Sequence, residues 1–329
     1  MKSFKRTALA AVAAGLLSVS TASAADSVKV TLGWLPGGDR AHFYVAKQEG
    51  FYAAENLDVQ IFPGKGSTDA MTKVATGVSD FGETGFDALL GAAVSSDVQL
   101  VGVMAIMNKP PDGLITTSTS GIKTLADLAG KKIATSPFTS SNQSWPALLR
   151  KAGVNPDSVT LLKVDPATMA PLLASGQVDG VIQFVTNSPL TAGVLQQAGK
   201  TIVAIPWADY GMVGYSNTLV ASKKTLETRR DMVVRFVRAT QKGLAVMETD
   251  PARAAAAFKA SVPEGNAEVA EKVIKATLPV IFNDKSKKDG LGVLTEQGVR
   301  ETWDRVAGEL NVPKDKIDPM KYVDFTIAK

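Results

Sequence analysis

The 329-residue sequence contains no cysteine, and its only histidine is His42. The lack of cysteine excludes disulfides, thiol chemistry and a lipid-modified cysteine as a membrane anchor. A metal site built from several histidine and cysteine ligands is also excluded, and a Ser-His-Asp triad could use only His42. The sequence has no Gly-x-Ser-x-Gly motif. We therefore expect a protein that is not an enzyme and that holds no metal and no cofactor.

Long hydrophobic runs are missing after the first 24 residues. Within those residues, Lys2, Lys5 and Arg6 precede a short apolar run at 8–19, and a small-x-small pattern follows at 22–24. These three parts are typical of a cleaved signal peptide, and the apolar run is too short to span a membrane. We expect a signal peptide at 1–24, a mature chain that starts at Ala25, and a periplasmic location, which suits a large cysteine-free exported protein.

The mature chain lacks an excess of either charge. The sequence has 36 Lys+Arg and 32 Asp+Glu, and three of the basic residues belong to the predicted leader, which leaves 33 against 32. Because nucleic-acid binding calls for a clustered basic excess, we expect no nucleic-acid partner. The hydrophobic content of 45% is enough for a substantial core, and the length indicates one large or two medium domains.

Short apolar runs alternate with helical patterns along much of the mature chain. The predicted strands lie at 28–32, 57–62, 78–82, 99–106, 159–164, 181–184 and 201–205. Predicted helices at 41–50, 68–76 and 87–94 separate the first of these strands. This alternation predicts an α/β fold with a largely parallel sheet. After residue 216 amphipathic helices dominate, at 228–248, 251–260, 267–278 and 295–310, and we expect them to pack on the first lobe.

One pattern occurs twice. A helical segment is followed by Gly77-Val78-Ser79-Asp80 and an apolar strand, and again by Gly176-Gln177-Val178-Asp179 and an apolar strand. In each copy the glycine can end the helix in the left-handed conformation that other residues avoid. The repetition predicts two similar α/β lobes.

Candidate binding residues lie in the loops that follow the predicted strands, because ligands of open α/β sheets bind beyond the carboxyl ends of strands. Aromatic residues make up only 6% of the chain, yet several fall in these loops, where their faces could hold a flat ring. The loop at 64–68 precedes a helix, so its backbone amides could instead hold a carboxylate, sulfonate or phosphate. The candidate ligand-binding residues are Trp34, His42, Gly64, Gly66, Ser67, Thr68, Thr84, Phe138, Ser140, Ser141, Asn142, Phe184, Thr186, Asn187 and Tyr210.

Several motifs occur in an order that resembles the NMT1/THI5-like, nitrate/sulfonate/taurine-type substrate-binding proteins. The motifs are Trp34-x-Pro36, His42-Phe43-Tyr44-Val45-Ala46-Lys47, Gly50-Phe51-Tyr52, Leu57-Asp58-Val59, Gly64-x-Gly66-Ser67, Gly77-x-x-Asp80-Phe81-Gly82, and Ile122-x-x-x-x-Asp127-Leu128-x-Gly130-Lys131-Lys132-Ile133. The sequence departs from the fungal pyrimidine-synthase branch of this family, which uses a cysteine-rich motif.

The resemblance implies a type II periplasmic-binding-protein fold, in which two hinge-connected α/β sandwiches close on a ligand. The expected limits are 25–113 for the first part of lobe 1, 114–212 for lobe 2, and 213–329 for the return to lobe 1 with the C-terminal helices. The crossings between the lobes are expected at 112–116 and 210–216. The implied partners are a small-molecule ligand and the membrane permease of an ABC importer with its ATPase, and the protein is expected to be a monomer.

The aromatic loops favour a heteroaromatic ligand such as a thiamin-precursor pyrimidine. The amides at 64–68 favour an organic sulfonate, nitrate or an aromatic carboxylate as the alternative. A secreted enzyme on the same scaffold and a sensor subunit of a membrane receptor are functions of a different class that the sequence leaves open.

Overall fold

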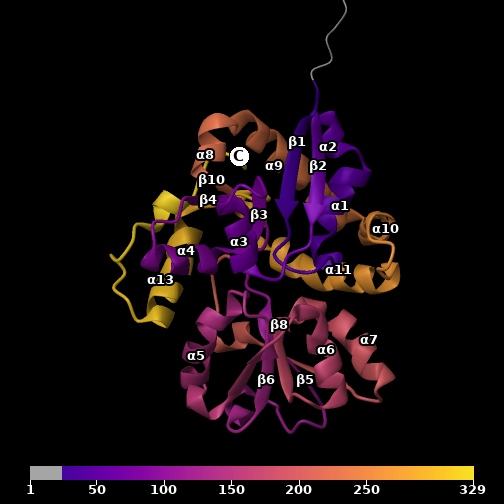
Figure 1. Ribbon diagram of the computed structural model, residues 1–329, viewed down its shortest axis with the longest axis vertical. Helices are drawn as coiled ribbons and strands as arrows, with labels where there is room; N and C mark the ends of the chain where they lie inside the picture. The colour runs from indigo at the N-terminus through magenta and orange to yellow at the C-terminus, as the bar shows by residue number, and fades with distance from the viewer. Residues whose placement is uncertain (1–23) are drawn as a thin grey trace, which may run out of the picture.

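The computed structural model describes residues 24–329, so the predicted signal peptide lies outside the described residues apart from Ala24. Two α/β lobes follow, one above the other in Figure 1, each built on a five-stranded sheet. No helix in the described part of the chain combines the length and the hydrophobicity that crossing a membrane requires.

The first lobe contains one sheet with the strand order β2-β1-β3-β10-β4. In β1, Val28 and Val30 are buried while Lys29 between them is exposed, which is the alternation that predicted this strand. The strands are β1 (Asp26–Thr31), β2 (Leu57–Phe62), β3 (Phe81–Gly85), β4 (Leu100–Ala105) and β10 (Asn217–Ser222). β1 is parallel to β2 and β3, whereas β10 runs antiparallel to β3 and β4.

The second lobe repeats this topology, with the strand order β7-β6-β8-β5-β9. Its strands are β5 (Asp112–Thr117), β6 (Lys132–Thr135), β7 (Thr160–Lys163), β8 (Gly180–Phe184) and β9 (Ile202–Pro206). Here β5 is the antiparallel strand. The expected two similar lobes are confirmed. Each sheet is also largely parallel, as expected, because four of its five strands run in one direction, and the remaining strand, β10 or β5, is inserted antiparallel to its neighbours.

The repeated sequence pattern has the same role in both lobes. Gly77 and Gly176 adopt the left-handed conformation at φ +75° and +78°. The carboxylate of Asp80 then accepts a hydrogen bond of 2.8 Å from the amide of Lys29, and the carboxylate of Asp179 accepts one of 2.8 Å from the amide of Lys132. In each lobe this bond ties the loop before one strand to the neighbouring parallel strand, at Lys29 within β1 and at Lys132, the first residue of β6.

Two connections join the lobes, at 106–111 between β4 and β5 and at 211–216 before β10. The expectation of a first crossing at 112–116 is wrong, because those residues belong to β5 and pair with both β8 and β9. Leu114 and Ile115 are fully buried on opposite faces of that strand, as an interior position in a sheet requires.

Helices cover both sheets (Figure 1). Those of the first lobe before the crossing are α1 (Ala41–Gln48), α2 (Phe51–Ala54), α3 (Ser67–Ala75) and α4 (Phe86–Ser95). The second lobe contains α5 (Ser141–Lys151), α6 (Pro166–Ser175) and α7 (Ser188–Gln197). The C-terminal part contains α8 (Lys223–Thr228), α9 (Arg230–Thr249), α10 (Pro251–Ser261), α11 (Ala267–Ile281), α12 (Asp284–Asp289) and α13 (Glu296–Leu310). Short 3-10 helices include η1 (Gly38–Arg40), η4 (Val185–Asn187) and η5 (Trp207–Tyr210).

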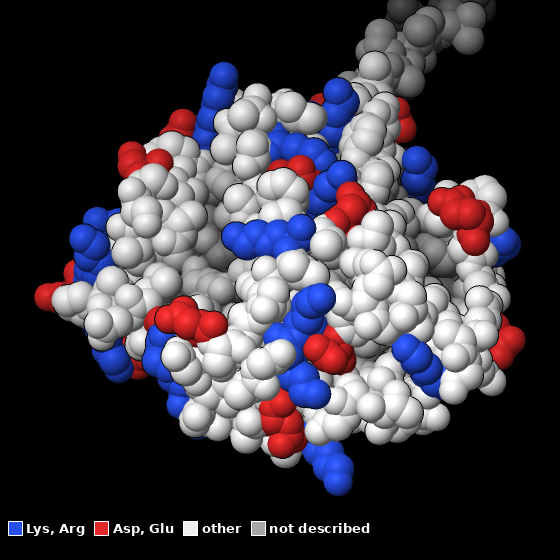
Figure 2. Space-filling view, turned by 60° about the horizontal axis from the view of Figure 1, so that its bottom comes forward, with Lys and Arg blue, Asp and Glu red and all other residues white. Residues whose placement is uncertain are grey.

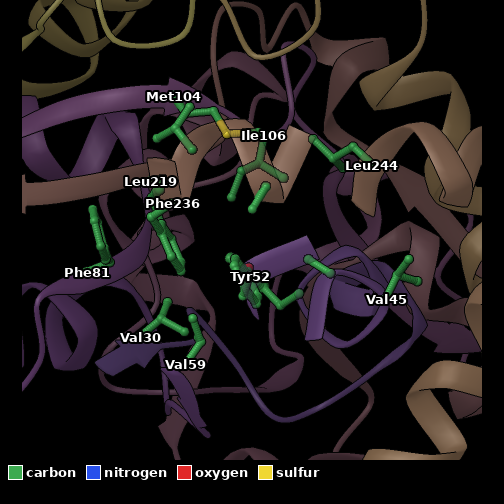
Figure 3. Packing of buried hydrophobic residues seen from close by; sticks show 14 of the residues in the cluster. Val30, Val45, Tyr52, Val59, Phe81, Met104, Ile106, Leu219, Phe236 and Leu244 are labelled. Atoms are coloured by element: carbon green, nitrogen blue, oxygen red, sulfur yellow. The ribbon is translucent and has the colours of Figure 1, made fainter. Parts of the chain in front are cut away.

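The C-terminal helices pack on the first lobe, as expected. α9 and α10 contact α1, and α13 contacts α4. An aromatic stack fixes α9 in place: Phe236 lies 4.2 Å from Phe81 and 5.1 Å from Tyr52 between ring centroids (Figure 3). α11 and α13 also reach the second lobe, where they contact α7 and α5, so both lobes share this helical layer.

Candidate ligand pocket between the lobes

A pocket with about 400 Å³ of free space, part of it open to solvent, lies where the two lobes meet. The first lobe contributes Gly33, Trp34, Arg40, Ser67 and Asn217, and the second contributes Thr139, Ser140, Ser141, Gln183, Phe184 and Asn187. Two aromatic rings, hydroxyls, amides and one guanidinium are a lining that fits a small ring with polar substituents.

The two aromatic residues of the pocket each pack on the opposite lobe. Trp34 lies in the loop after β1, yet its side chain packs against the apolar cluster of the second lobe. Phe184 ends β8 in the second lobe and packs against the main core cluster of the first. Burying these rings across the boundary favours the closed arrangement of the lobes.

Hydrogen bonds join the lobes around the pocket. The amide of Thr68 donates to the carbonyl of Phe138 at 3.0 Å, and the hydroxyl of Ser136 donates to the carbonyl of Lys65 at 2.7 Å. Gly66 permits this contact, because its φ is +145° and a Cβ there would lie 2.4 Å from the carbonyl of Phe138. The ammonium of Lys65 also pairs with Asp165 of the second lobe at 3.0 Å.

The loop at 64–68 uses several of its amides within the protein. The amide of Gly64 donates to the carbonyl of Trp34, that of Lys65 to the carboxylate of Asp69, and that of Thr68 to Phe138. The sequence predicted that the amides of this loop could donate hydrogen bonds to a bound anion, but these three already donate to acceptors within the protein.

Arg40 is the only cation that lines the pocket among residues 24–329. It is 2% exposed, and its Nε donates to the Oε2 atom of Glu83 at 2.6 Å while Nη1 pairs with Asp39. Burial opposes its charge, but the attraction of Asp39 and Glu83 outweighs burial and raises the pKa of Arg40 above its ordinary value. Glu83 also accepts hydrogen bonds from the amide of Gly33 at 2.9 Å and the side chain of Asn217 at 2.5 Å, which orders that wall of the pocket.

The predicted site residues divide into two groups. The pocket lining includes Trp34, Ser67, Ser140, Ser141, Phe184 and Asn187. It does not include His42, Gly64, Gly66, Thr68, Thr84, Phe138, Asn142, Thr186 and Tyr210. Several of the second group support the pocket indirectly, because Gly66, Thr68 and Phe138 form the contact between the lobes beside it.

His42 lies in α1, away from the pocket lining, and is completely buried. Neither ring nitrogen has a hydrogen-bond partner within the described range. Burial, with a smaller contribution from Arg40, lowers the pKa of His42 to about 3, so the imidazole is neutral at ordinary pH. His42, which the sequence predicted as a ligand contact, is therefore a buried core side chain in the structure.

Three other predicted residues serve the interior of their own lobe. The amide group of Asn142 bonds to Thr135 and to the carbonyl of Ser136. The phenol oxygen of Tyr210 accepts a hydrogen bond from the amide of Leu125 at 3.0 Å. Thr84 is fully buried in β3.

Sequence reasoning missed Gly33, Arg40, Gln183 and Asn217. Arg40 follows a Pro-Gly-Gly stretch after a predicted strand, which is a position typical of binding residues, and Glu83 follows another strand. Their pairing spans 43 residues of sequence, so no local pattern could reveal it.

A second buried polar cluster lies behind the pocket, where α4, α5, β5 and α13 meet. The hydroxyl of Ser141 donates to the Oδ1 atom of Asp112 at 2.6 Å, and that of Ser144 donates to Glu309 at 2.8 Å. Arg305 of α13 lies 2.9 Å from Glu309 and 3.6 Å from Asp87. Burial and then the charge of Asp87 raise the pKa of Asp112 to about 7. Because α4 belongs to the first lobe and α5 and β5 belong to the second, this cluster links the two lobes. It lies beside the end of the connection at 106–111, which leads into β5.

Known proteins with similar sequences cover most of the chain. A Haemophilus influenzae protein whose name refers to thiamine biosynthesis is 28% identical over 84% of this chain and 86% of its own length. The formylaminopyrimidine-binding protein of Halalkalibacterium halodurans is 25% identical over 88% of each. A third relative is named as an enzyme, the 4-amino-5-hydroxymethyl-2-methylpyrimidine phosphate synthase of Legionella pneumophila, with 24% identity over 79% of this chain and 82% of its own.

The fold is also found in solved structures. The alkanesulfonate-binding protein SsuA of Xanthomonas axonopodis pv. citri, bound to MOPS, superposes with a TM-score of 0.70 at 18% identity. The match covers 92% of this chain and 99% of that one, and it confirms the two-lobed periplasmic-binding-protein fold. The family model described as NMT1/THI5 like matches residues 38–254, and the chain therefore belongs to the NMT1/THI5-like family.

Proposed function

We propose that this chain is a periplasmic solute-binding protein that closes on a small heteroaromatic ligand, such as a thiamin-precursor pyrimidine, for an ABC importer. The observation that carries the proposal is the pocket between the lobes, where Trp34 and Phe184 from opposite lobes line one space with hydroxyl and amide groups. Such a pocket is complete only when the lobes are together, so ligand binding and closure support each other. The relatives named for thiamine biosynthesis and formylaminopyrimidine binding agree with a pyrimidine.

Export and delivery complete the proposal. The segment at 1–24 would direct the chain to the periplasm and be removed before Ala25. A membrane permease and its ATPase would then accept the ligand from the closed protein. Both signs of charge are scattered over the face seen in Figure 2.

The first test is a thermal-shift and calorimetric screen of unfolded, washed and refolded mature protein. The panel contains 4-amino-5-hydroxymethyl-2-methylpyrimidine, riboflavin, taurine, nitrate and an aromatic carboxylate. A ligand that binds only the folded state raises the melting temperature, so we expect the pyrimidine to give the largest shift. A shift with taurine or nitrate alone would contradict the heteroaromatic assignment and favour the sulfonate alternative.

A matched pair of variants tests the site itself. Trp34→Ala removes a ring that lines the pocket, and Phe138→Ala removes a ring that is 39% exposed and does not line it. We expect the first to weaken pyrimidine binding at least about tenfold and the second to change it less than about threefold, given the size of an aromatic contact. Equal losses would contradict the location of the site.

An enzyme on the same scaffold is the second candidate, because one relative is named as a synthase. The only histidine lies outside the pocket and the sequence has no cysteine, so the pocket lining offers no imidazole or thiol. We expect the bound pyrimidine to be recovered unchanged by mass spectrometry after long incubation with the protein. A changed mass that depends on the protein would favour the enzyme.

A further inference from the structure

The wall of the pocket contains one cation between two anions. Arg40 is 2% exposed, Asp39 is 1% exposed and Glu83 is fully buried. The three side chains, here called the Asp39–Arg40–Glu83 cluster, carry a formal charge of −1. Because burial weakens screening by water and salt, this charge acts strongly on a ligand in the adjacent pocket.

Arg40 retains hydrogen-bonding capacity toward the pocket. Its Nε donates to Glu83 and its Nη1 to Asp39, while Nη2 has no acceptor within residues 24–329. A guanidinium carries five N–H donors, so donors remain beyond these two bonds. Since Arg40 lines the pocket, a ligand atom that accepts hydrogen bonds can use them.

The second lobe contacts the same cluster. The side-chain amide of Asn187 donates to the Oδ2 atom of Asp39 at 3.2 Å, across the boundary between the lobes. The Oδ1 atom of Asp39 is buried without a partner in the described chain. Asp39 therefore contacts both Arg40 and the closing lobe.

An unpaired arginine in a pocket would attract anions, because a guanidinium binds carboxylates and sulfonates well. Here Asp39 and Glu83 more than balance its charge, so an anion would meet net repulsion. A neutral ligand with an acceptor atom, such as a ring nitrogen, meets no such repulsion and still gains the hydrogen bond.

We propose that Asp39 and Glu83 make Arg40 a specificity residue that accepts neutral, hydrogen-bond-accepting ligands and rejects anions. The inference rests on the proposed function for the identity of the natural ligand. The discrimination against anions, here called the charge rule, depends only on the charges of the pocket wall.

Asp39→Asn is the decisive variant. An asparagine oxygen can take the place of Oδ2 and still accept from Arg40 and Asn187, while one negative charge is lost. Removing one charge at about 6 to 12 Å from a bound ion changes its affinity by about a hundredfold to tenfold at an effective dielectric constant of about 20. We expect Asp39→Asn to bind methanesulfonate at least about tenfold more tightly than wild type, and 4-amino-5-hydroxymethyl-2-methylpyrimidine within about threefold at pH 8.

Asp157→Asn is the charge-matched control, because Asp157 is exposed and lies outside the pocket lining. It should leave methanesulfonate affinity unchanged. Both dissociation constants are measured by calorimetry on refolded protein at two salt concentrations, and circular dichroism checks the fold. If Asp39→Asn does not fold, Glu83→Gln removes the other negative charge and replaces it in the comparison.

The inference is overturned if wild type already binds methanesulfonate as tightly as the folded variant, or if the charge loss gives no gain. Failure of both proteins to bind the pyrimidine would count against the proposed function. The methanesulfonate comparison would still support or overturn the charge rule in that case.

Discussion

At the scale of single residues, His42 shows how burial turns a suspected ligand contact into a stability determinant. Its pKa is about 3 in the folded protein against 6.5 ordinarily, so between these values the unfolded chain binds a proton that the folded chain does not. Stability from this residue is therefore complete above pH 6.5 and falls as the pH is lowered, by about 1.4 kcal/mol per pH unit. In urea unfolding, the stability of His42→Leu relative to wild type should therefore rise by this amount for each pH unit below 6.5, because only wild type loses the contribution of His42.

His42→Leu should also keep its ligand affinity within about twofold, because the imidazole does not line the pocket and has no hydrogen bond to lose within the described range. A large loss of affinity with normal folding would show that His42 acts on the ligand after all. Leucine fills the site, so the cavity that alanine would leave does not confuse the comparison.

Gly66 supports a second prediction at this scale. A side chain at this position would meet the carbonyl of Phe138 on the other lobe at 2.4 Å. Gly66→Ala should therefore hold the lobes apart, weaken pyrimidine binding at least about tenfold and increase the radius of gyration in X-ray scattering. Alanine would also be strained within the first lobe by about 1–3 kcal/mol, because the φ of +145° and ψ of 174° at Gly66 are essentially restricted to glycine, so circular dichroism must show that the lobes keep their fold.

Gly77→Ala is the matched control for backbone strain. Gly77 also has a positive φ, of +75°, but nothing lies within 4 Å of the position of its Cβ. We expect a loss of stability of about 1 kcal/mol and unchanged affinity. Equal effects of the two variants on affinity would mean that strain, rather than contact between the lobes, explains the result.

At the scale of elements, Asp112 marks the place where β5 begins and three helices meet. Its carboxyl faces Asp87 of α4, Ser141 of α5 and Arg305 of α13. The folded pKa of about 7 lies above the ordinary 3.8, so between these values the folded chain binds the extra proton. Stability from Asp112 therefore falls as the pH rises through this window, which is the opposite of the effect of His42.

The pH dependences that His42 and Asp112 give to the free energy of unfolding have opposite signs, and they should nearly cancel in wild type between about pH 4 and 6.5. Asp112→Asn keeps an acceptor for Ser141 and removes the titration, so its unfolding free energy should rise with pH across this range because the His42 dependence remains. At pH 8 the variant should be more stable than wild type by up to about 4 kcal/mol, because the rise of the Asp112 pKa from 3.8 to about 7 corresponds to about 1.4 kcal/mol per unit. A pH profile parallel to that of wild type in urea unfolding would contradict this assignment.

The elements themselves were largely predictable, and the pairings between them were not. The Gly-x-x-Asp pattern at Asp80 and Asp179 predicted two similar lobes because its bonds are local to each sheet. The direction of β5 and β10 could not be predicted, because buried strands look alike in either direction. The same limit applies to the site, since the partners of Arg40 come from residues that only the fold brings together.

At the scale of the whole molecule, the packing of Trp34 and Phe184 each against the opposite lobe provides a fluorescent probe of closure, because one of the two rings is a tryptophan. Trp34 is the one tryptophan that lines the pocket among the described residues, while Trp145, Trp207 and Trp303 are at most 3% exposed in the cores of the lobes. If the lobes open, Trp34 would leave the cluster of the second lobe and enter water, while the other three rings would stay buried within their own lobes. Emission that changes on binding should therefore come from Trp34.

We expect Trp34→Phe to lose the ligand-dependent change in emission while scattering still records a smaller radius of gyration on binding. The phenylalanine keeps an apolar ring for the second lobe, so affinity should fall by less than it does in Trp34→Ala. Trp303→Phe is the matched control and should keep the full change in emission. If the change instead persisted in Trp34→Phe and disappeared in Trp303→Phe, ligand binding would be sensed through α13 and its contact with α5, and closure would have to start from the helical layer rather than from the pocket.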